Sequence, residues 1–337
     1  MTPTVAYFDL ADDERAQTDD LLRTLAGRYD SAEDHEFVAS AGRLAAQLPD
    51  RLLDAVGAFR REETSASLVV RGLGVDDTEL GPTPLNWRHR ANPAATRRYE
   101  LYLLLVSAAL GEVFGWSTLQ DGRLVHDVLP MPAEKDEQSG HGTVRLEWHT
   151  EDGFHPFRCD YLLLLGLRNP DEVGTTVAGV DAVSVTPERR AVLRQSRFLI
   201  RPDNEHLNRA ADLVAGTGRT HSMQVMQDAP EPCAVLFGDD QQPYLRVDPA
   251  FMEPLPGDTE AKDALADLVN QLEDQLREVT VGPGDLFIVD NYKAVHGRSA
   301  FQARYDGTDR WLKKAVCSRD LRKSRSLRPA AGARVVC

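Results

Sequence analysis

The chain has 337 residues, a formal net charge of -14 and a pI of about 5.1. An acidic protein repels phosphate backbones, so these values argue against nucleic acid as a partner. The first residues, MTPTVAYFDLADDERAQTDD, include acids and lack the basic start and apolar run of a secretory signal. The longest apolar runs are too short to cross a bilayer. We therefore expect a cytoplasmic protein with no membrane partner.

The cysteines and the C-terminal charges give two further expectations. The four cysteines are far apart and form no CxxC pair, which argues against a disulfide framework and against a zinc-thiolate site. Residues 321–337 are locally basic, in contrast to the acidic chain. We interpret this basic C-terminal tail as a solvated extension.

The N-terminal part predicts helices. Apolar residues recur at helical spacing between Asp12 and Arg61, and a second long helix is expected over Pro93 to Phe114. Between them, the apolar run SASLVVRGLGV ends in glycines and predicts a strand. Residues 1–115 thus form a helical lead-in with flanking helices.

From Trp116 onward the sequence consists of short β-type segments broken by Gly, Pro, Asn and Asp. Helices interrupt them only near residues 187–195 and 259–279. Together with the lead-in, this predicts one α+β domain whose core is a closed or sandwiched β structure flanked by helices. The expected strands lie within residues 123–130, 143–150, 159–167, 176–185, 197–202, 233–238, 243–248, 285–291, 294–297 and 310–318.

The segment Leu146 to Asp152 contains the first candidate metal ligands. His149 and Glu151 are two residues apart, so on one strand both side chains leave the same face. His296 precedes a glycine, where we expect a backbone turn to point the imidazole inward. Two imidazoles and one carboxylate form the facial triad that suits iron(II). A solvated strand face is the alternative for the H-x-E pattern alone.

Arg310 follows His296 by fourteen residues, in the strand-like segment DRWLKKAVCS. A guanidinium can bind the distal carboxylate of 2-oxoglutarate through two parallel hydrogen bonds, while the 2-oxo acid end chelates the metal. The alternative is a surface ion pair with Asp306 or Asp309.

Several motifs together resemble a known family. They are HTED-x-FHP-x-x-CDYL around His149, LRNP, GDL-x-x-x-DN-x-x-x-VHGR-x-x-F around His296, and DG-x-DRWLK around Arg310. This pattern, from about Phe114 to Asp320, resembles the clavaminate-synthase-like 2-oxoglutarate oxygenases. Within these it is most similar to bacterial hydroxylases of free amino acids, such as the arginine and asparagine β-hydroxylases of peptide-antibiotic pathways.

The resemblance implies a distorted jelly-roll core, that is, a double-stranded β-helix of the cupin-like kind. It implies one oxygenase domain over residues 1–320, with the jelly roll in residues 116–320 and a lid over about residues 201–231. The cofactors it implies are Fe(II) at His149, Glu151 and His296, 2-oxoglutarate at Arg310, and O2. A threonine, Thr175 or Thr176, would supply a hydroxyl to the cosubstrate, although both could instead fill a strand.

The resemblance also implies how a free amino acid would be held. Glu151 would contact the α-ammonium as well as the metal, helped by Gln120. Lys314, four residues after Arg310, would bind the α-carboxylate. Relatives more often have arginine at this position, and lysine keeps the charge but lacks the planar fork. An exposed strand residue is the alternative for Lys314.

Two acidic places match the side-chain pocket of the arginine hydroxylases. Asp203 and Glu205 lie in RPDNEH, and Asp248 lies in RVDPAF. Carboxylates there would suit a guanidinium or an ammonium. The family pattern has a second acid two residues after the first, where this chain has Ala250. Either Glu205 compensates, or the substrate is a modified or cyclic guanidino amino acid.

The sequence thus predicts a hydroxylase of a free L-amino acid, at Cβ of L-arginine or a related guanidino amino acid, with succinate and CO2 as coproducts. Cγ hydroxylation, desaturation and other substrates (asparagine, lysine, citrulline) are alternatives on the same scaffold. A non-catalytic small-molecule binding protein is an alternative of another class. The oligomeric state is left open.

Overall fold

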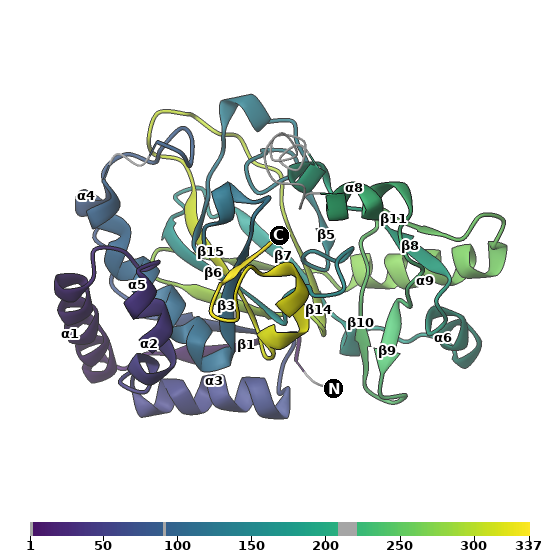
Figure 1. The fold of residues 1–337 in the computed structure, drawn as a ribbon, viewed down its shortest axis with the longest axis horizontal. Coiled ribbons are helices and arrows are strands. Elements are labelled where there is room, and N and C mark those ends of the chain that lie inside the picture. The colour runs from purple at the N-terminus through teal and green to yellow at the C-terminus, as the bar shows by residue number, and fades with distance from the viewer. Residues whose placement is uncertain (1–2, 90–91, 208–220) are drawn as a thin grey trace.

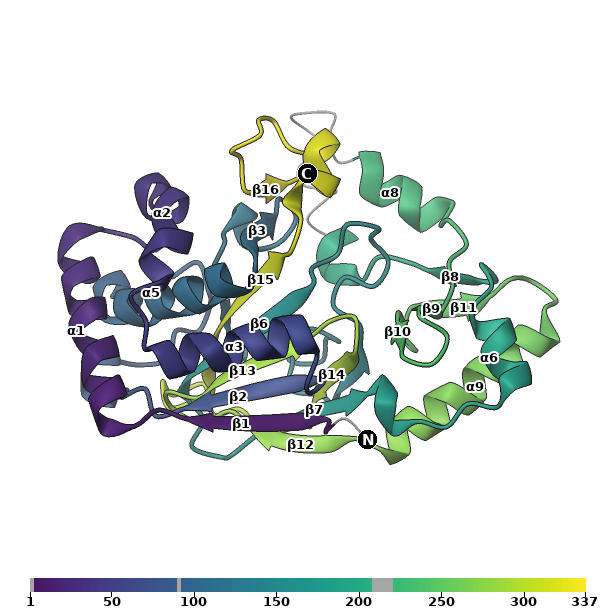
Figure 2. The same ribbon diagram turned by 90° about the horizontal axis from the view of Figure 1, so that it is seen from below.

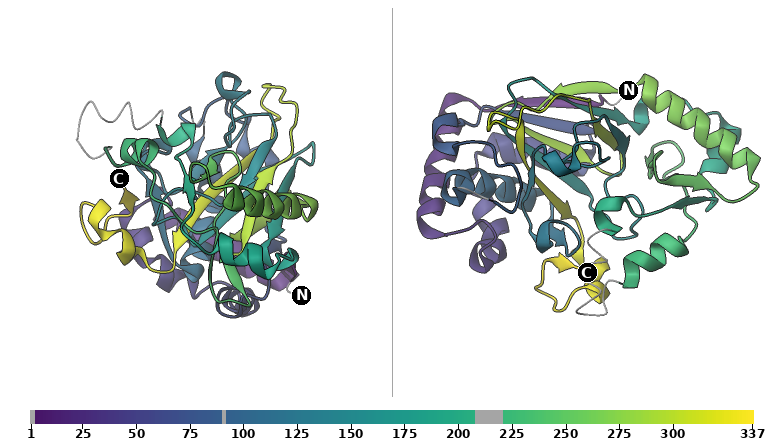
Figure 3. Two further views of the ribbon diagram at one scale, coloured as in Figure 1. Left: turned by 90° about the vertical axis from the view of Figure 1, so that its right-hand side faces the viewer. Right: turned by 90° about the horizontal axis from the view of Figure 1, so that it is seen from above.

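The computed structural model describes residues 3–89, 92–207 and 221–337. Figure 1 shows a central β structure with the N-terminal helices on one side and a smaller group of strands and helices on the other. The right-hand view of Figure 3 shows the two groups at opposite ends of the molecule. Among the described residues no helix has the length and apolar character needed to span a membrane.

Four N-terminal helices cover one face of the large sheet. They are α1 (Asp12–Arg28), α2 (His35–Ala45), α3 (Asp50–Glu62) and α5 (Pro93–Leu110), and the short α4 (Asp77–Leu80) precedes α5. Side chains cap the N-termini of α2 and α5. Asp34 accepts a hydrogen bond from the Glu36 amide, and Asn92 accepts one from the Ala95 amide. The helix α5 is buried along most of its length, packing against α1, α2 and α3 on one side and the sheet on the other.

The large sheet has eight strands and follows the order β1-β2-β13-β6-β15-β3-β16, with β4 also paired to β15. Figure 2 shows its strands under the N-terminal helices. Its pairs are antiparallel except for β1 with β2 and β16 with β3. The strands are β1 (Val5–Asp9), β2 (Ser67–Arg71), β3 (Glu112–Trp116), β4 (His126–Val128), β6 (Tyr161–Arg168), β13 (Leu286–Asp290), β15 (Trp311–Ser318) and β16 (Val335–Val336).

A second sheet of four strands has the order β12-β7-β14-β5 and is antiparallel. Two ribbons, β9 with β10 and β8 with β11, and the helices α6, α8 and α9 complete the described part of the chain. Their bounds are β5 (Leu146–His149), β7 (Gly174–Gly179), β8 (Phe198–Ile200), β9 (Leu236–Gly238), β10 (Pro243–Leu245), β11 (Met252–Pro254), β12 (Arg277–Thr280), β14 (Ala294–Arg298), α6 (Pro187–Leu193), α8 (His221–Asp228) and α9 (Thr259–Asp274).

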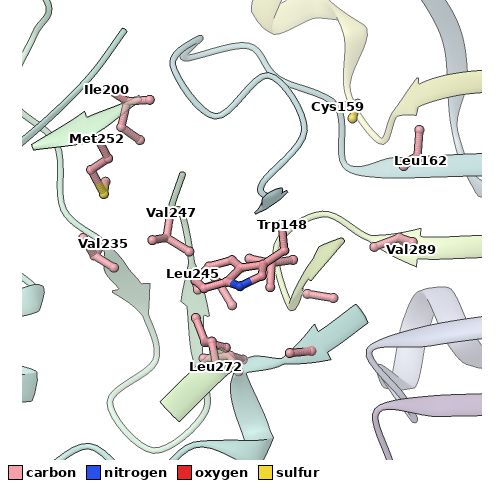
Figure 4. Packing of buried hydrophobic residues seen from close by; sticks show 14 of the residues in the cluster. Trp148, Cys159, Leu162, Ile200, Val235, Leu245, Val247, Met252, Leu272 and Val289 are labelled. Carbon is pink, nitrogen blue, oxygen red and sulfur yellow. The ribbon is translucent and has the colours of Figure 1, made fainter. Parts of the chain in front are cut away.

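Apolar side chains form two buried clusters, one between the N-terminal helices and the large sheet and one around the four-stranded sheet. Figure 4 shows Trp148 in the second cluster, near Leu245, Val247 and Leu272. Its indole Nε1 donates to Glu273 at 2.7 Å. Because side chains alternate along β5, Trp148 anchors the strand in this core while its neighbour His149 faces the other way.

The expected strands and helices are largely observed, with three corrections. The predicted helix over residues 259–279 ends at Asp274, and the chain then forms β12, because Arg277 to Thr280 pair with β7. The predicted helix ending at Phe114 stops at Leu110, and β3 begins at Glu112; between them, a Cβ atom at Gly111 would lie 2.5 Å from the Ser318 carbonyl oxygen. Residues 1–115 are more than a helical lead-in, since β1 and β2 form one edge of the large sheet.

The C-terminal residues are not the solvated extension that their charge suggested. The 3-10 helix η4 (Leu321–Leu327) and β16 pack against the domain, and Val336 is buried. Arg328 is buried as well, and its guanidinium donates to the carbonyls of Leu321, Ala331 and Ala333. Carbonyls rather than phosphates or solvent satisfy this cation, which local charge alone does not reveal.

Candidate metal centre and active site

A cavity between the two sheets contains the candidate metal ligands. Its walls include Leu162 and Leu164 from β6 of the large sheet and His296 from β14 of the small one. All of the predicted site residues line it except Thr176. The predicted residues in its wall are Gln120, His149, Glu151, Thr175, Asp203, Glu205, Asp248, His296, Arg310 and Lys314.

The two histidines face each other across paired strands. His149 on β5 is the direct register partner of His296 on β14, and their ring centroids are 4.8 Å apart. Together with Glu151, they offer ligand atoms that all lie within 4.8 Å of one another. The Glu151 carboxylate is 3.6 Å from His149 Nε2 and 3.3 Å from His296 Nε2. These two nitrogens and one oxygen are the donor set of a facial iron(II) site.

His296 reaches the cavity for a different reason from the one expected. It lies inside β14, not at a turn, and a register irregularity separates it from Arg298. At Gly297 a Cβ atom would lie 2.6 Å from the Leu146 carbonyl oxygen and 2.9 Å from the Trp148 amide nitrogen. Glycine is therefore required for the close approach of β14 to β5.

Glu151 does not share a strand with His149, because β5 ends at His149 and Glu151 lies in the following turn. The side chain of Asn291 holds this turn. Its Oδ1 accepts from the Glu151 amide at 2.8 Å, and its Nδ2 donates to the carbonyls of Glu151 and Cys159, both at 3.0 Å. Sequence reasoning assigned Asn291 no role, although it is part of the DN pair in the family pattern.

Hydrogen bonds and nearby charges orient the His149 ring and keep the Glu151 carboxylate ionised. His149 Nδ1 donates to the Glu147 carbonyl at 2.8 Å, which orients the ring so that Nε2 faces Glu151 and the cluster. Burial raises the pKa of Glu151, but the Lys314 ammonium and hydrogen bonds from His149 and His296 outweigh it and hold that pKa well below its ordinary value. The carboxylate is therefore ionised, as a metal ligand must be.

Arg310 is a buried cation without a carboxylate partner. It is 5% exposed, and its Nη2 donates to Thr175 Oγ1 at 3.4 Å, while its Nε has no partner. Among the described residues it forms no ion pair; Asp309 instead accepts from the backbone amides of Arg304 and Tyr305. Burial, and to a smaller degree the charge of Arg298, lowers the pKa of Arg310. An unpaired buried charge is costly, so this guanidinium requires an anion from outside the chain.

Thr175 and Thr176 point in opposite directions, as neighbours on a strand do. Thr175 is buried, lines the cavity and contacts Arg310, whereas Thr176 does not line it. The Thr176 hydroxyl lies instead beside Gly297. The structure thus separates two residues that the sequence left equivalent.

Lys314 is not the exposed strand residue of the alternative interpretation. It forms an ion pair with Glu151, and its ammonium faces the cavity. The backbone of Asp127 holds the Gln120 side chain. Gln120 Nε2 donates to the Asp127 carbonyl at 2.8 Å, and Gln120 Oε1 accepts from the Asp127 amide at 2.9 Å. Gln120 has a φ of +40°, a left-handed backbone, so its position depends on these contacts.

Three further carboxylates line the cavity. Asp203 accepts from the His206 amide, and Asp248 accepts from the amides of Ala250 and Phe251. Burial raises the pKa of Glu205 to about 7, and the nearby Asp203 adds to this shift. Burial likewise raises the pKa of Asp248 to about 6. Of the expected lid, residues 204–207 are helical and α8 follows at His221; residues 208–220 lie outside the described residues.

Comparison with known proteins gives the same class of site. Residues 103–316 match the family model described as taurine catabolism dioxygenase TauD, TfdA family. The chain therefore belongs to the TauD/TfdA family of dioxygenases.

Individual relatives are similar over nearly the whole chain. An enduracididine beta-hydroxylase of Streptomyces hygroscopicus is 43% identical, covering 97% of this chain and 98% of the relative. An L-ornithine/L-arginine 3-hydroxylase of Catenulispora acidiphila is 41% identical, covering 94% and 95%. The crystal structure of the non-heme iron oxygenase OrfP with Fe, succinate and (3S)-hydroxy-L-Arg has a TM-score of 0.94 and 41% identity, covering 98% and 99%.

Proposed function

We propose that this protein is an iron(II)- and 2-oxoglutarate-dependent hydroxylase of a free cationic L-amino acid, acting at Cβ of L-arginine or a related guanidino amino acid. One observation carries the proposal. Arg310 is buried and forms no ion pair with the described residues, in the same cavity as a two-histidine, one-carboxylate cluster. A metal cluster beside an unsatisfied cation matches a bidentate 2-oxo acid that has a second carboxylate.

The residues fit the metal. His149 and His296 each have a ring nitrogen near Glu151, and the Glu147 carbonyl orients the His149 ring. A set of two nitrogens and one carboxylate leaves positions for a cosubstrate and for O2. Bound there, iron(II) would activate O2, the oxidant whose one oxygen atom goes to succinate as 2-oxoglutarate loses CO2 and whose other becomes the hydroxyl on an unactivated carbon.

The residues also fit the cosubstrate. Arg310 would pair with its distal carboxylate through two hydrogen bonds, and the Thr175 hydroxyl would donate a further one. This pairing removes the cost of burying the guanidinium alone, so we expect 2-oxoglutarate to stabilise the protein.

The α-amino acid end of the substrate would replace an existing ion pair. In the structure Lys314 and Glu151 pair with each other. A zwitterion carries both opposite charges, so its carboxylate can take over Lys314 while its ammonium takes over Glu151, with Gln120 beside it. The exchange leaves each buried charge with a partner.

The side-chain end favours a cation. Asp203, Glu205 and Asp248 line this part of the cavity, and none of them is paired with a described basic residue. A guanidinium or ammonium would supply the missing charge. The relatives of the preceding section act, by their names, on enduracididine, ornithine and arginine, which supports a guanidino or amino side chain.

A cyclic or otherwise modified guanidino amino acid is a second candidate. Ala250, which is exposed and lines the cavity, stands where the family pattern has an acid. It provides room and lacks the second carboxylate that would grip a linear guanidinium.

The architecture of the domain belongs to the same proposal. We infer one distorted jelly-roll domain, supported by the sheets of eight and four strands that enclose the cavity, and it extends past the expected boundary at residue 320 because β16 pairs with β3.

A substrate panel tests the function. Purified protein with iron(II), ascorbate and 2-oxoglutarate is offered arginine, ornithine, lysine, citrulline, asparagine and a cyclic guanidino amino acid. We expect succinate and a product heavier by one oxygen atom with guanidino substrates, and neither with His149→Ala. Absence of succinate above background with every amino acid would contradict the proposal, and turnover of asparagine alone would refute the cationic pocket.

A further inference from the structure

A chain of buried polar side chains lies in and behind the wall of the cavity, with Asp152 and His206 in the wall itself. Trp116 Nε1 donates to Asp152 Oδ2 at 2.6 Å, and His206 Nε2 donates to Asp152 Oδ1 at 3.0 Å. On its other side, His206 Nδ1 is 2.7 Å from the Thr118 hydroxyl. All four side chains are buried, and His206 is 0% exposed. The metal, the cosubstrate and the amino acid of the proposed reaction require none of these contacts.

The chain joins three segments that are distant in sequence. Thr118 follows β3, Asp152 follows β5, and His206 lies in the helical turn over residues 204–207. Each segment also carries a proposed substrate residue: Gln120 is two residues after Thr118, Glu151 immediately precedes Asp152, and Glu205 immediately precedes His206. The buried chain is therefore the point where these three parts of the cavity wall meet.

The turn over residues 204–207 has no strand partner to fix it. Asp203 starts the turn by accepting from the His206 amide at 3.0 Å. Glu205 forms no hydrogen bond or ion pair with the described residues, so its own side chain does not hold it in place. Rings also surround His206, with Phe154 at 5.0 Å and Trp116 at 5.9 Å between centroids. His206 is therefore the side chain of this turn that connects it to the rest of the domain.

Asp152 has features that packing alone does not require. Its φ of +49° is a left-handed backbone that costs energy in a residue other than glycine, although Asp tolerates it better than most. A buried carboxylate is also costly, and apolar residues of similar volume would often stabilise a core as well. A buried polar network of this kind is retained where it fixes the relative positions of the segments that it joins.

We propose that His206 is a positioning residue for amino-acid binding: through Asp152 and Thr118 it holds the turn that directs Asp203 and Glu205 into the cavity. The proposal rests on the proposed function. It predicts that a change at His206 alters the KM for the amino acid and leaves the KM for 2-oxoglutarate unaltered. Thr175 lies on β7 and Arg310 immediately precedes β15, so neither depends on the turn.

Two variants at His206 test it with a matched control. His206→Phe keeps a ring between Phe154 and Trp116 and removes both hydrogen bonds, and His206→Gln retains a donor for Asp152. Asn204→Ala changes an exposed residue of the same turn. Thr118→Val, a milder change at the other end of the chain, keeps the test available if His206→Phe does not fold.

Steady-state kinetics and hydrogen exchange are the readouts. We expect His206→Phe to raise the KM for arginine about 10-fold or more, as loss of buried hydrogen bonds to a charged group does. The KM for 2-oxoglutarate should stay within about two-fold, succinate should form in excess over hydroxylated product, and amides of residues 203–207 should exchange faster. His206→Gln should lie between, and Asn204→Ala should match the wild type.

The outcomes separate this proposal from the function on which it rests. If the amide hydrogen exchange of residues 203–207 is unchanged in His206→Phe, the proposal that His206 holds this turn is wrong. A rise in both KM values by the same factor, with the melting temperature lowered, overturns the specific role and indicates general support of the fold. If the wild type turns over no amino acid, the proposed function fails, and with it the substrate part of this proposal, whatever the exchange data show.

Discussion

The two ends of the cavity are built in different ways. At the metal and cosubstrate end, His149 and His296 are register partners on β5 and β14, and Thr175 lies on β7. At the proposed amino-acid end, Asp203 and Asp248 lie in loops and Glu205 lies in the helical turn over residues 204–207. Backbone pairing fixes the first set, whereas side-chain hydrogen bonds hold the second.

This difference implies that the strand-built end determines the reaction and that the turn-built end determines which amino acid is bound. Ligands on paired strands keep their geometry when loops vary, so the reaction can be preserved while the substrate changes. Two similar proteins are named for different substrates, enduracididine in one and ornithine or arginine in the other. Changes at the strand-built end should therefore remove activity, and changes at the turn-built end should shift preference among amino acids.

The largest effect is expected at the strand-built end. His149→Ala removes one of three metal ligands, and we expect it to abolish both tight iron(II) binding and succinate formation. Anaerobic calorimetry with iron(II) measures the first and succinate release the second. Glu147→Gln is the control, because it keeps the backbone carbonyl that lies 2.8 Å from His149 Nδ1. Retention of full turnover in His149→Ala would refute the assigned metal site.

Arg310→Met should have the second largest effect. Loss of a charge-assisted pair costs about 2–4 kcal/mol, which raises the KM for 2-oxoglutarate roughly 30- to 1000-fold. Because the variant also removes an unpaired buried charge, ligand-free Arg310→Met should melt at or above the temperature of the wild type. Arg304→Met is a suitable control, since Arg304 pairs with Asp171 at the surface. An unaltered KM for 2-oxoglutarate would show that Arg310 is not its clamp.

The turn-built end should respond to pH. The pKa of Asp248 is raised to about 6 and that of Glu205 to about 7. As the pH falls through these values the carboxylates become neutral, so the KM for arginine should rise about 10-fold between pH 7.5 and pH 5. The KM for 2-oxoglutarate serves as the internal control.

The sign for stability is opposite in the ligand-free protein. A carboxyl whose folded pKa lies above its unfolded value binds more protons when folded, so these two groups favour the folded state as the pH falls from about 7 towards 4. Asp248→Asn should reduce both pH effects. A KM for arginine that stays constant over this range would argue against a carboxylate pocket.

The smallest effect is expected from Lys314→Arg. Arginine keeps the charge that pairs with Glu151 and adds a planar fork, so the KM for arginine should change by less than about five-fold. Lys314→Met, which removes the charge, should raise the same KM clearly more. Equal kinetics in the two variants would exclude Lys314 from binding the α-carboxylate.

The residues of the strand-built end could be predicted from the sequence, because their types and order match the pattern of a known family, whereas the shared strand face expected for His149 and Glu151 was wrong. The triad and Arg310 were identified from the H-x-E pair and two later positions, and the structure brings these side chains to one cavity. The local geometry was not predictable. Glu151 lies beyond its strand because Asn291, 140 residues away, holds the turn.

The turn-built end and its supports depended on contacts that spacing cannot encode. The buried pairing of Asp152 with His206 joins positions 54 residues apart, and neither residue has a metal-like or helical spacing to mark it. The packing of the C-terminal residues could not be predicted for the same reason. It depends on hydrogen bonds from Arg328 to backbone carbonyls and on the pairing of β16 with β3.

Turnover under isotopically heavy dioxygen tests the central claim most directly. Wild-type protein with iron(II), 2-oxoglutarate and L-arginine should yield succinate that contains one heavy oxygen atom and an arginine product that gains one oxygen, analysed together by mass spectrometry. Both signals should disappear in His149→Ala and diminish in Arg310→Met. Unlabelled succinate, or arginine recovered unchanged while labelled succinate accumulates at the same rate with and without it, would contradict an arginine hydroxylase.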